Sequence, residues 1–84
     1  MNKLIYISAT WCNPCKVFSP ILDKVAMSGI PVQKLDADRD HAFISPYGVR
    51  TVPTVIKIDA SGNEIDRISG VTSEQQVIEF YNKK

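Results

Sequence analysis

One stretch decides the fold of this chain: Ala9-Thr10-Trp11-Cys12-Asn13-Pro14-Cys15-Lys16. It contains both cysteines of the sequence, and it lies between an apolar run at 4–7 and a helical pattern at 17–27. This arrangement predicts a strand, a turn, and then a helix that starts at the cysteine pair. Pro14 suits the first turn of that helix, because an N–H at this position would have no helical partner.

The spacing of the two cysteines indicates a dithiol redox site. Free backbone N–H groups and the helix dipole favour negative charge at a helix N-terminus. Because such a position lowers the pKa of a thiol, and the thiolate is the nucleophile, we predict that Cys12 is exposed and reactive and that Cys15 is shielded. The same cysteine pair could instead belong to a structural zinc site or form an inert structural disulfide. A structural zinc site needs four ligands, and His41 is the only histidine. An inert disulfide closing so short a loop would stabilise the fold little.

Composition sets the broad class of the protein. The 84 residues predict a single domain, 1–84. The net charge of +1 and the scattered charges give no indication of nucleic-acid binding. No apolar run reaches the length of about 18 residues that spans a membrane, or of about 7–15 in a signal peptide. We therefore expect a cytoplasmic monomer, in a compartment where a close cysteine pair is more often catalytic than structural.

Hydrophobic periodicity, read outward from the cysteines, predicts an α/β fold with the order β-α-β-α-β-β-α. We expect strands at 4–8, 32–36, 54–58 and 64–68, and helices at 15–28, 38–44 and from 73 onward. The first helix joins parallel strands by a right-handed crossover, and Pro20 is expected to kink it. The short turn at 60–63 makes the last two strands a hairpin, with Ile65 and Ile68 as its inward residues. The result is a four-stranded mixed sheet flanked by three helices.

Several of these segments resemble the thioredoxin family. Trp11-Cys12-Asn13-Pro14-Cys15-Lys16 resembles the family's Trp-Cys-Gly-Pro-Cys-Lys site and departs only at Asn13. Tyr47-Gly48-Val49-Arg50-Thr51-Val52-Pro53-Thr54 resembles the segment that leads into the family's cis-proline loop, and Gly70 falls where the family has a glycine beside the active site. The resemblance covers about residues 4–82. It implies the thioredoxin-like fold in a minimal form, since the family's first strand and helix have no counterpart here.

The resemblance implies a thiol–disulfide oxidoreductase that acts as a protein-disulfide reductase. It implies no bound cofactor and no metal, because the Cys12–Cys15 disulfide is itself the redox group. The expected substrates are protein disulfides, with ribonucleotide reductase among them, and thioredoxin reductase is the expected electron donor. The residues it implies are catalytic Cys12 and Cys15, substrate-binding Trp11, Val52, Pro53 and Gly70, and Asn13, Pro14, Lys16 and Lys34 as residues that tune the site.

One departure concerns the buried acid that the family places six positions before the first cysteine, which is Tyr6 here. Lys34 matches a lysine near that acid and so lacks its partner. Two other functions remain open. A glutaredoxin-like, glutathione-dependent oxidoreductase is favoured by the short chain and by Thr51-Val52-Pro53. A non-enzymatic module would hold a partner through Trp11, Val52 and Gly70.

Overall fold

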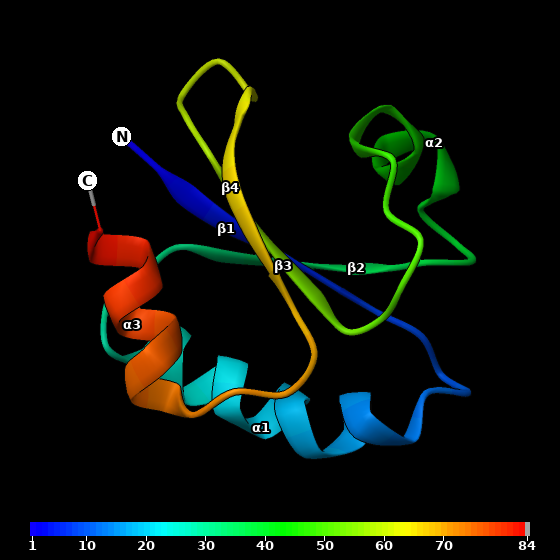
Figure 1. Ribbon diagram of the computed structural model, residues 1–84, viewed down its shortest axis with the longest axis horizontal. Coiled ribbons are helices and arrows are strands. Elements are labelled where there is room, and N and C mark those ends of the chain that lie inside the picture. Colours follow the sequence, from blue (N-terminus) through cyan, green and yellow to red (C-terminus); the bar gives the residue numbers. More distant parts are fainter. Residues whose placement is uncertain (84) are drawn as a thin grey trace.

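Four strands form one mixed sheet in the order β2-β1-β3-β4 in this computed structural model, which describes residues 1–83 (Figure 1). β1 and β2 are parallel, whereas β3 is antiparallel to both β1 and β4. The predicted class, element order and hairpin are confirmed. The strands are β1 (Lys3–Ser8), β2 (Val32–Asp36), β3 (Thr54–Ile58) and β4 (Glu64–Ser69), and the helices are α1 (Asn13–Met27), α2 (His41–Ile44), the 3-10 helix η1 (Ser45–Tyr47) and α3 (Glu74–Asn82).

The two faces of the sheet are covered by different helices, because successive strand residues point to opposite sides. Leu4 and Tyr6 of β1 pack with residues of α1 and α3 in the larger core. Ile5 and Ile7 face the other way, toward α2 and the segment that follows it. Figure 1 shows α1 and α3 on one side of the sheet and α2 on the other. Both faces of β1 are therefore buried, and the loop that carries the cysteines leaves the sheet at its central part.

Two helices differ from their predicted bounds. α1 begins at Asn13, with Cys12 as its N-cap, rather than at Cys15. α2 covers His41–Ile44 with Asp40 as its N-cap, whereas the predicted helix was to be capped by Asp38 or one of its neighbours. The reason lies in the preceding loop, where the Asp36 carboxylate accepts hydrogen bonds from the N–H groups of Asp38 and Arg39. These bonds hold a turn that competes with the start of a helix.

The inward position predicted for Ile65 is wrong. Its side chain is 48% exposed, whereas Ile68 packs against the larger core. Residues three apart on a strand lie on opposite faces, so only one of the two isoleucines can point inward.

A charged side chain occupies the most buried strand, which the sequence did not predict. All of β3 is buried, and Lys57 is 2% exposed. Its ammonium donates hydrogen bonds to the carbonyl oxygens of Phe80 (3.0 Å) and Lys83 (2.6 Å) at the C-terminal end of α3. Lys57 therefore satisfies carbonyls that have no partner within the helix.

Candidate active site

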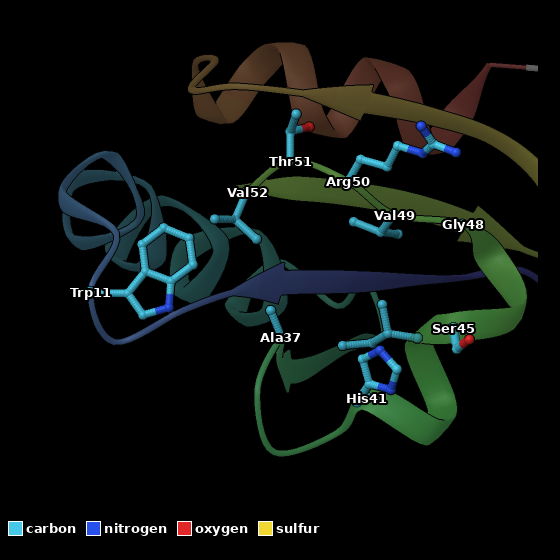
Figure 2. A pocket seen from close by; sticks show the side chains of 10 residues that line it. Trp11, Ala37, His41, Ser45, Gly48, Val49, Arg50, Thr51 and Val52 are labelled. Carbon is cyan, nitrogen blue, oxygen red and sulfur yellow. The ribbon is translucent and has the colours of Figure 1, made fainter.

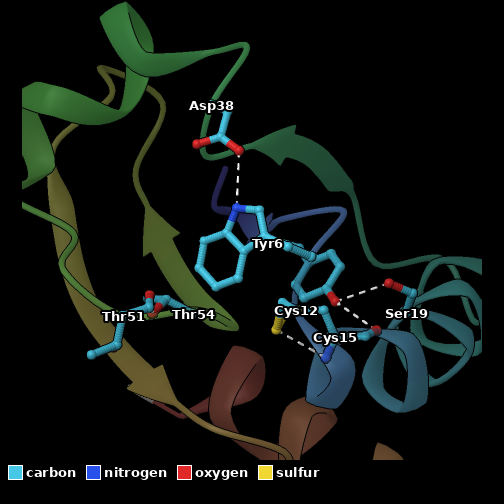
Figure 3. Close-up of a disulfide and its surroundings, with 8 residues drawn as sticks. Tyr6, Cys12, Cys15, Ser19, Asp38, Thr51 and Thr54 are labelled. Atoms are coloured by element: carbon cyan, nitrogen blue, oxygen red, sulfur yellow. Dashed lines mark hydrogen bonds between the residues drawn. A yellow bond between two sulfur atoms is a disulfide. The ribbon is translucent and has the colours of Figure 1, made fainter.

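A disulfide joins Cys12 and Cys15 at the N-terminal end of α1, where a local cap is built from the same residues. Cys12 has extended backbone angles, and its Sγ accepts a hydrogen bond from the Cys15 N–H at 3.2 Å (Figure 3). A cap residue normally uses a side-chain oxygen for this bond. Here the sulfur takes that place, so the free N–H groups of the helix point at the atom that gains negative charge when the disulfide opens.

Both cysteines are covered by neighbouring residues. Cys12 is 4% exposed and Cys15 is 2% exposed, and Ala9, Ala37 and Val52 pack against them. The prediction of an exposed Cys12 is therefore wrong for the disulfide form, while the shielding of Cys15 is confirmed. The cover over Cys12 comes from the loop after β2 and the loop before β3, which sequence spacing alone does not bring together.

Trp11 stands beside the disulfide as an exposed indole. Its side chain is 66% exposed, and its Nε1–H donates a hydrogen bond of 3.0 Å to the Asp38 carboxylate. Figure 3 shows this carboxylate reaching over from the loop after β2. The sequence analysis did not select Asp38. The only available signal was the acidic run at 36–40, which is common on protein surfaces. The bond holds the indole in place although little protein surrounds it.

The loop before β3 brings together the other residues predicted to bind substrate. Val52 packs against the cysteines, and the Val52–Pro53 peptide bond is cis, the isomer that the resemblance implied. The Gly70 N–H donates to the Pro53 carbonyl at 2.9 Å, and the Thr54 hydroxyl donates to the Thr51 carbonyl at 2.7 Å. These bonds fix the loop to the ends of β3 and β4.

The residues predicted to tune the site divide into two groups. Asn13, Pro14 and Lys16 are exposed on the first turn of α1, next to the disulfide. Lys34 has no contact with it, because its ammonium pairs with the Asp23 carboxylate at the surface. Position 6, where the resemblance implies an acid near Lys34, is occupied by Tyr6, so the Lys34 ammonium has no carboxylate partner there.

Tyr6 is fully buried beneath the cysteines. Its hydroxyl donates to the Cys15 carbonyl at 3.3 Å and shares a hydrogen bond of 2.9 Å with the Ser19 hydroxyl (Figure 3). Its ring meets that of Phe18 edge-on, with 5.6 Å between the centroids. The position therefore holds a hydroxyl network tied to the backbone of α1, and Ser19 is a partner that the sequence analysis did not identify.

A groove of about 520 Å³ is lined in part by Ala37 and Val52, the residues that pack against the cysteines (Figure 2). Trp11 and Val52 border one end, and the groove extends past Ala37 and His41 toward Gly48. His41, the only histidine, is exposed at this groove.

Residues 1–83 lack two further features. No group of three or more His, Cys, Asp or Glu side chains is arranged to hold a metal ion in this part of the chain. Within the same residues, no helix has both the length and the apolar character needed to cross a membrane.

Comparison with known proteins shows one consistent similarity. The family model described as thioredoxin matches residues 1–83. A thioredoxin of Chlamydia caviae is 33% identical over 82 residues, covering 95% of this chain and 79% of the relative. A thioredoxin of Staphylococcus epidermidis is 31% identical, covering 96% and 80%. Among solved structures, Fasciola hepatica thioredoxin superposes with a TM-score of 0.87 at 27% identity, covering 98% of this chain and 79% of that one.

Proposed function

Because this chain belongs to the thioredoxin family, we propose how its own residues reduce protein disulfides. Membership of the family, together with the Cys12–Cys15 pair, makes the protein a thiol–disulfide oxidoreductase that acts as a protein-disulfide reductase. One observation supports the assignment of different roles to Cys12 and Cys15. The Cys12 sulfur accepts the Cys15 N–H at the tip of α1, so Cys12 is the sulfur whose negative charge the helix stabilises.

The reaction has two exchange steps. In the dithiol form, the Cys12 thiolate attacks one sulfur of the substrate disulfide, whose S–S bond breaks as a mixed disulfide forms. The other substrate sulfur leaves as a thiolate and takes up a proton. Cys15 then loses its proton and attacks the Cys12 sulfur, which breaks the mixed disulfide and releases the second substrate thiolate. Two electrons have passed to the substrate, and the Cys12–Cys15 disulfide has formed.

The substrate main chain pairs with the loop before β3. Within residues 1–83 the Val52 N–H and carbonyl make no hydrogen bond, so both are free for an extended segment to pair with. Pro53 has no N–H to leave unsatisfied beneath such a segment. Trp11 and Gly70 supply the rest of the contact surface for the substrate.

The proton of Cys15 goes to the departing substrate thiolate or to water. Tyr6 supplies a hydroxyl where the resemblance to the family implies a carboxylate, and this hydroxyl is already bonded to the Cys15 carbonyl and to Ser19. In this proposal the Tyr6 hydroxyl holds the start of α1 and transfers no proton.

Electrons reach the protein from an NADPH-linked thioredoxin reductase, and ribonucleotide reductase is among the substrates. Because a reductase must be kept as a dithiol, the cytoplasm is the expected location. The oxidised protein should be incubated with thioredoxin reductase and NADPH in one series and with glutathione in another. We expect rapid reduction in the first series and slow reduction in the second. Faster reduction by glutathione would assign the chain to glutathione-dependent chemistry instead.

A further inference from the structure

The side chains lining the groove near the disulfide that can carry charge are all basic. Ten residues line it, and the side chains among them that can carry charge are His41 and Arg50, both of which can be positive. They come from opposite walls, since His41 begins α2 and Arg50 lies on the loop between Gly48 and Pro53 (Figure 2). No acidic residue contributes to the lining. The groove lining, which includes Ala37 and Val52 that pack against the disulfide, therefore contains basic side chains and no carboxylate.

Both basic side chains are available to a ligand. His41 and Arg50 are exposed, and neither side chain makes an ion pair or hydrogen bond within residues 1–83. The nearby carboxylates lie outside the groove lining. Asp38 accepts from the Trp11 indole, and Asp36 and Asp40 accept from backbone N–H groups of their own loop. Asp36 and Asp40 line a separate hollow beside Ser8.

Apart from Ser45 and Thr51, the other side chains that line the groove are apolar. Figure 2 shows Ala37, Val49 and Val52 directed into it, with the Trp11 ring at one end. An extended segment paired with the Val52 backbone would direct alternate side chains toward this groove. An apolar side chain of the segment can pack against these residues. A carboxylate side chain can pair with the Arg50 guanidinium, which donates two parallel hydrogen bonds to a carboxylate, or with His41 on the opposite wall.

We propose that this groove selects protein disulfides whose flanking sequence carries an aspartate or glutamate near the reactive cysteine. His41 and Arg50 are the residues that determine this specificity, and the disulfide chemistry itself does not depend on them. The inference rests on the proposed function, because it concerns the substrate of the same site. The occupant is an acidic extended segment of the protein substrate, and the argument for it is charge complementarity.

Matched disulfide peptides test this inference. A series should place Asp, Asn or Lys in turn at each position flanking the cysteine, with dithiothreitol regenerating the dithiol form. At the preferred position the Asp peptide should have a kcat/KM about two- to fivefold higher than the Asn peptide, which is the size expected of an exposed ion pair. The difference should diminish at high salt, since screening weakens exposed charge pairs.

Variants separate this preference from the chemistry. Arg50→Glu should invert the preference toward the Lys peptide, and His41→Gln should reduce it. Arg39→Gln is the matched control, because Arg39 is exposed outside the groove lining. Reduction of a small aromatic disulfide should be unchanged in all three variants. Equal kcat/KM values for Asp, Asn and Lys peptides at every position would overturn the specificity inference while leaving the function intact. If no peptide disulfide and no small disulfide were reduced, the proposed function itself would be wrong.

Discussion

The hydroxyl of Tyr6 provides a test of what replaces a buried acid in this site. Tyr6→Phe removes that hydroxyl and leaves the ring, which is fully buried and meets Phe18 edge-on. The packing contribution should therefore survive the change. What is lost is the bond of 2.9 Å with Ser19 and the longer bond of 3.3 Å to the Cys15 carbonyl.

The expected loss of stability follows from these two bonds. A net hydrogen bond contributes about 1 kcal/mol, and the longer bond contributes less. Ser19 is only half-buried, so water can reach its hydroxyl and limit the penalty. We expect the free energy of unfolding to fall by about 1–1.5 kcal/mol. For a domain of this size that corresponds to a Tm lowered by about 5–10 °C.

Thermal unfolding of the reduced protein measures this loss, and a double-mutant cycle with Ser19→Ala isolates the bond between the two hydroxyls. The cycle should give a coupling energy of about 1 kcal/mol. Activity toward a protein disulfide should change by less than about twofold, because in our account the hydroxyl holds α1 and moves no proton. A loss of about a hundredfold in kcat, in a variant that still folds, would refute this reasoning and place Tyr6 in the proton transfer.

Three further predictions concern other parts of the structure. Lys57→Met keeps the buried stem but leaves the carbonyls at the end of α3 without a donor. The free energy of unfolding, measured by chemical denaturation, should therefore fall by about 2 kcal/mol. An unchanged value would show that the cap is not stabilising. Asp38→Ala should release the Trp11 indole and lower kcat/KM for protein disulfides by about two- to tenfold, while the rate toward small disulfides stays unchanged. Equal losses for both kinds of substrate would contradict the role of Asp38 in holding the indole. The hydrogen bond from Arg67 lowers the pKa of Glu64 from its ordinary value of 4.5, so its stabilisation is complete above that pH and is lost as the pH falls through the lowered pKa. Glu64→Gln should flatten this acid limb of the stability profile, and an unaltered limb would assign it to other carboxylates.

Features encoded by neighbouring residues were predictable from the sequence. The cysteine spacing with Pro14 specified the start of a helix, and Ser73, at the predicted start of the last helix, forms a capping box with Gln76. Such signals act over a few residues, so no tertiary information is needed to interpret them. The same is true of the short turn that makes β3 and β4 a hairpin.

The missed features depend on contacts between residues far apart in the chain. Asp38 and Trp11 are 27 residues apart, and Lys57 and Phe80 are 23 apart. The residues adjacent to Asp38 and Lys57 in the sequence do not distinguish these two from other charged residues on a surface loop or at a strand edge. The burial of Cys12 was missed for a similar reason, since its cover comes from two other loops.

Trapping of the mixed disulfide tests the central claim, that Cys12 attacks the substrate and Cys15 resolves the intermediate. Cys15→Ser and Cys12→Ser variants, both reduced, should be mixed with the same protein disulfide, and covalent complexes should be quantified by non-reducing electrophoresis and mass spectrometry. Our account predicts that Cys15→Ser accumulates a complex through Cys12 and that Cys12→Ser forms little or none. Accumulation through Cys15 in the Cys12→Ser variant, with none through Cys12, would contradict it.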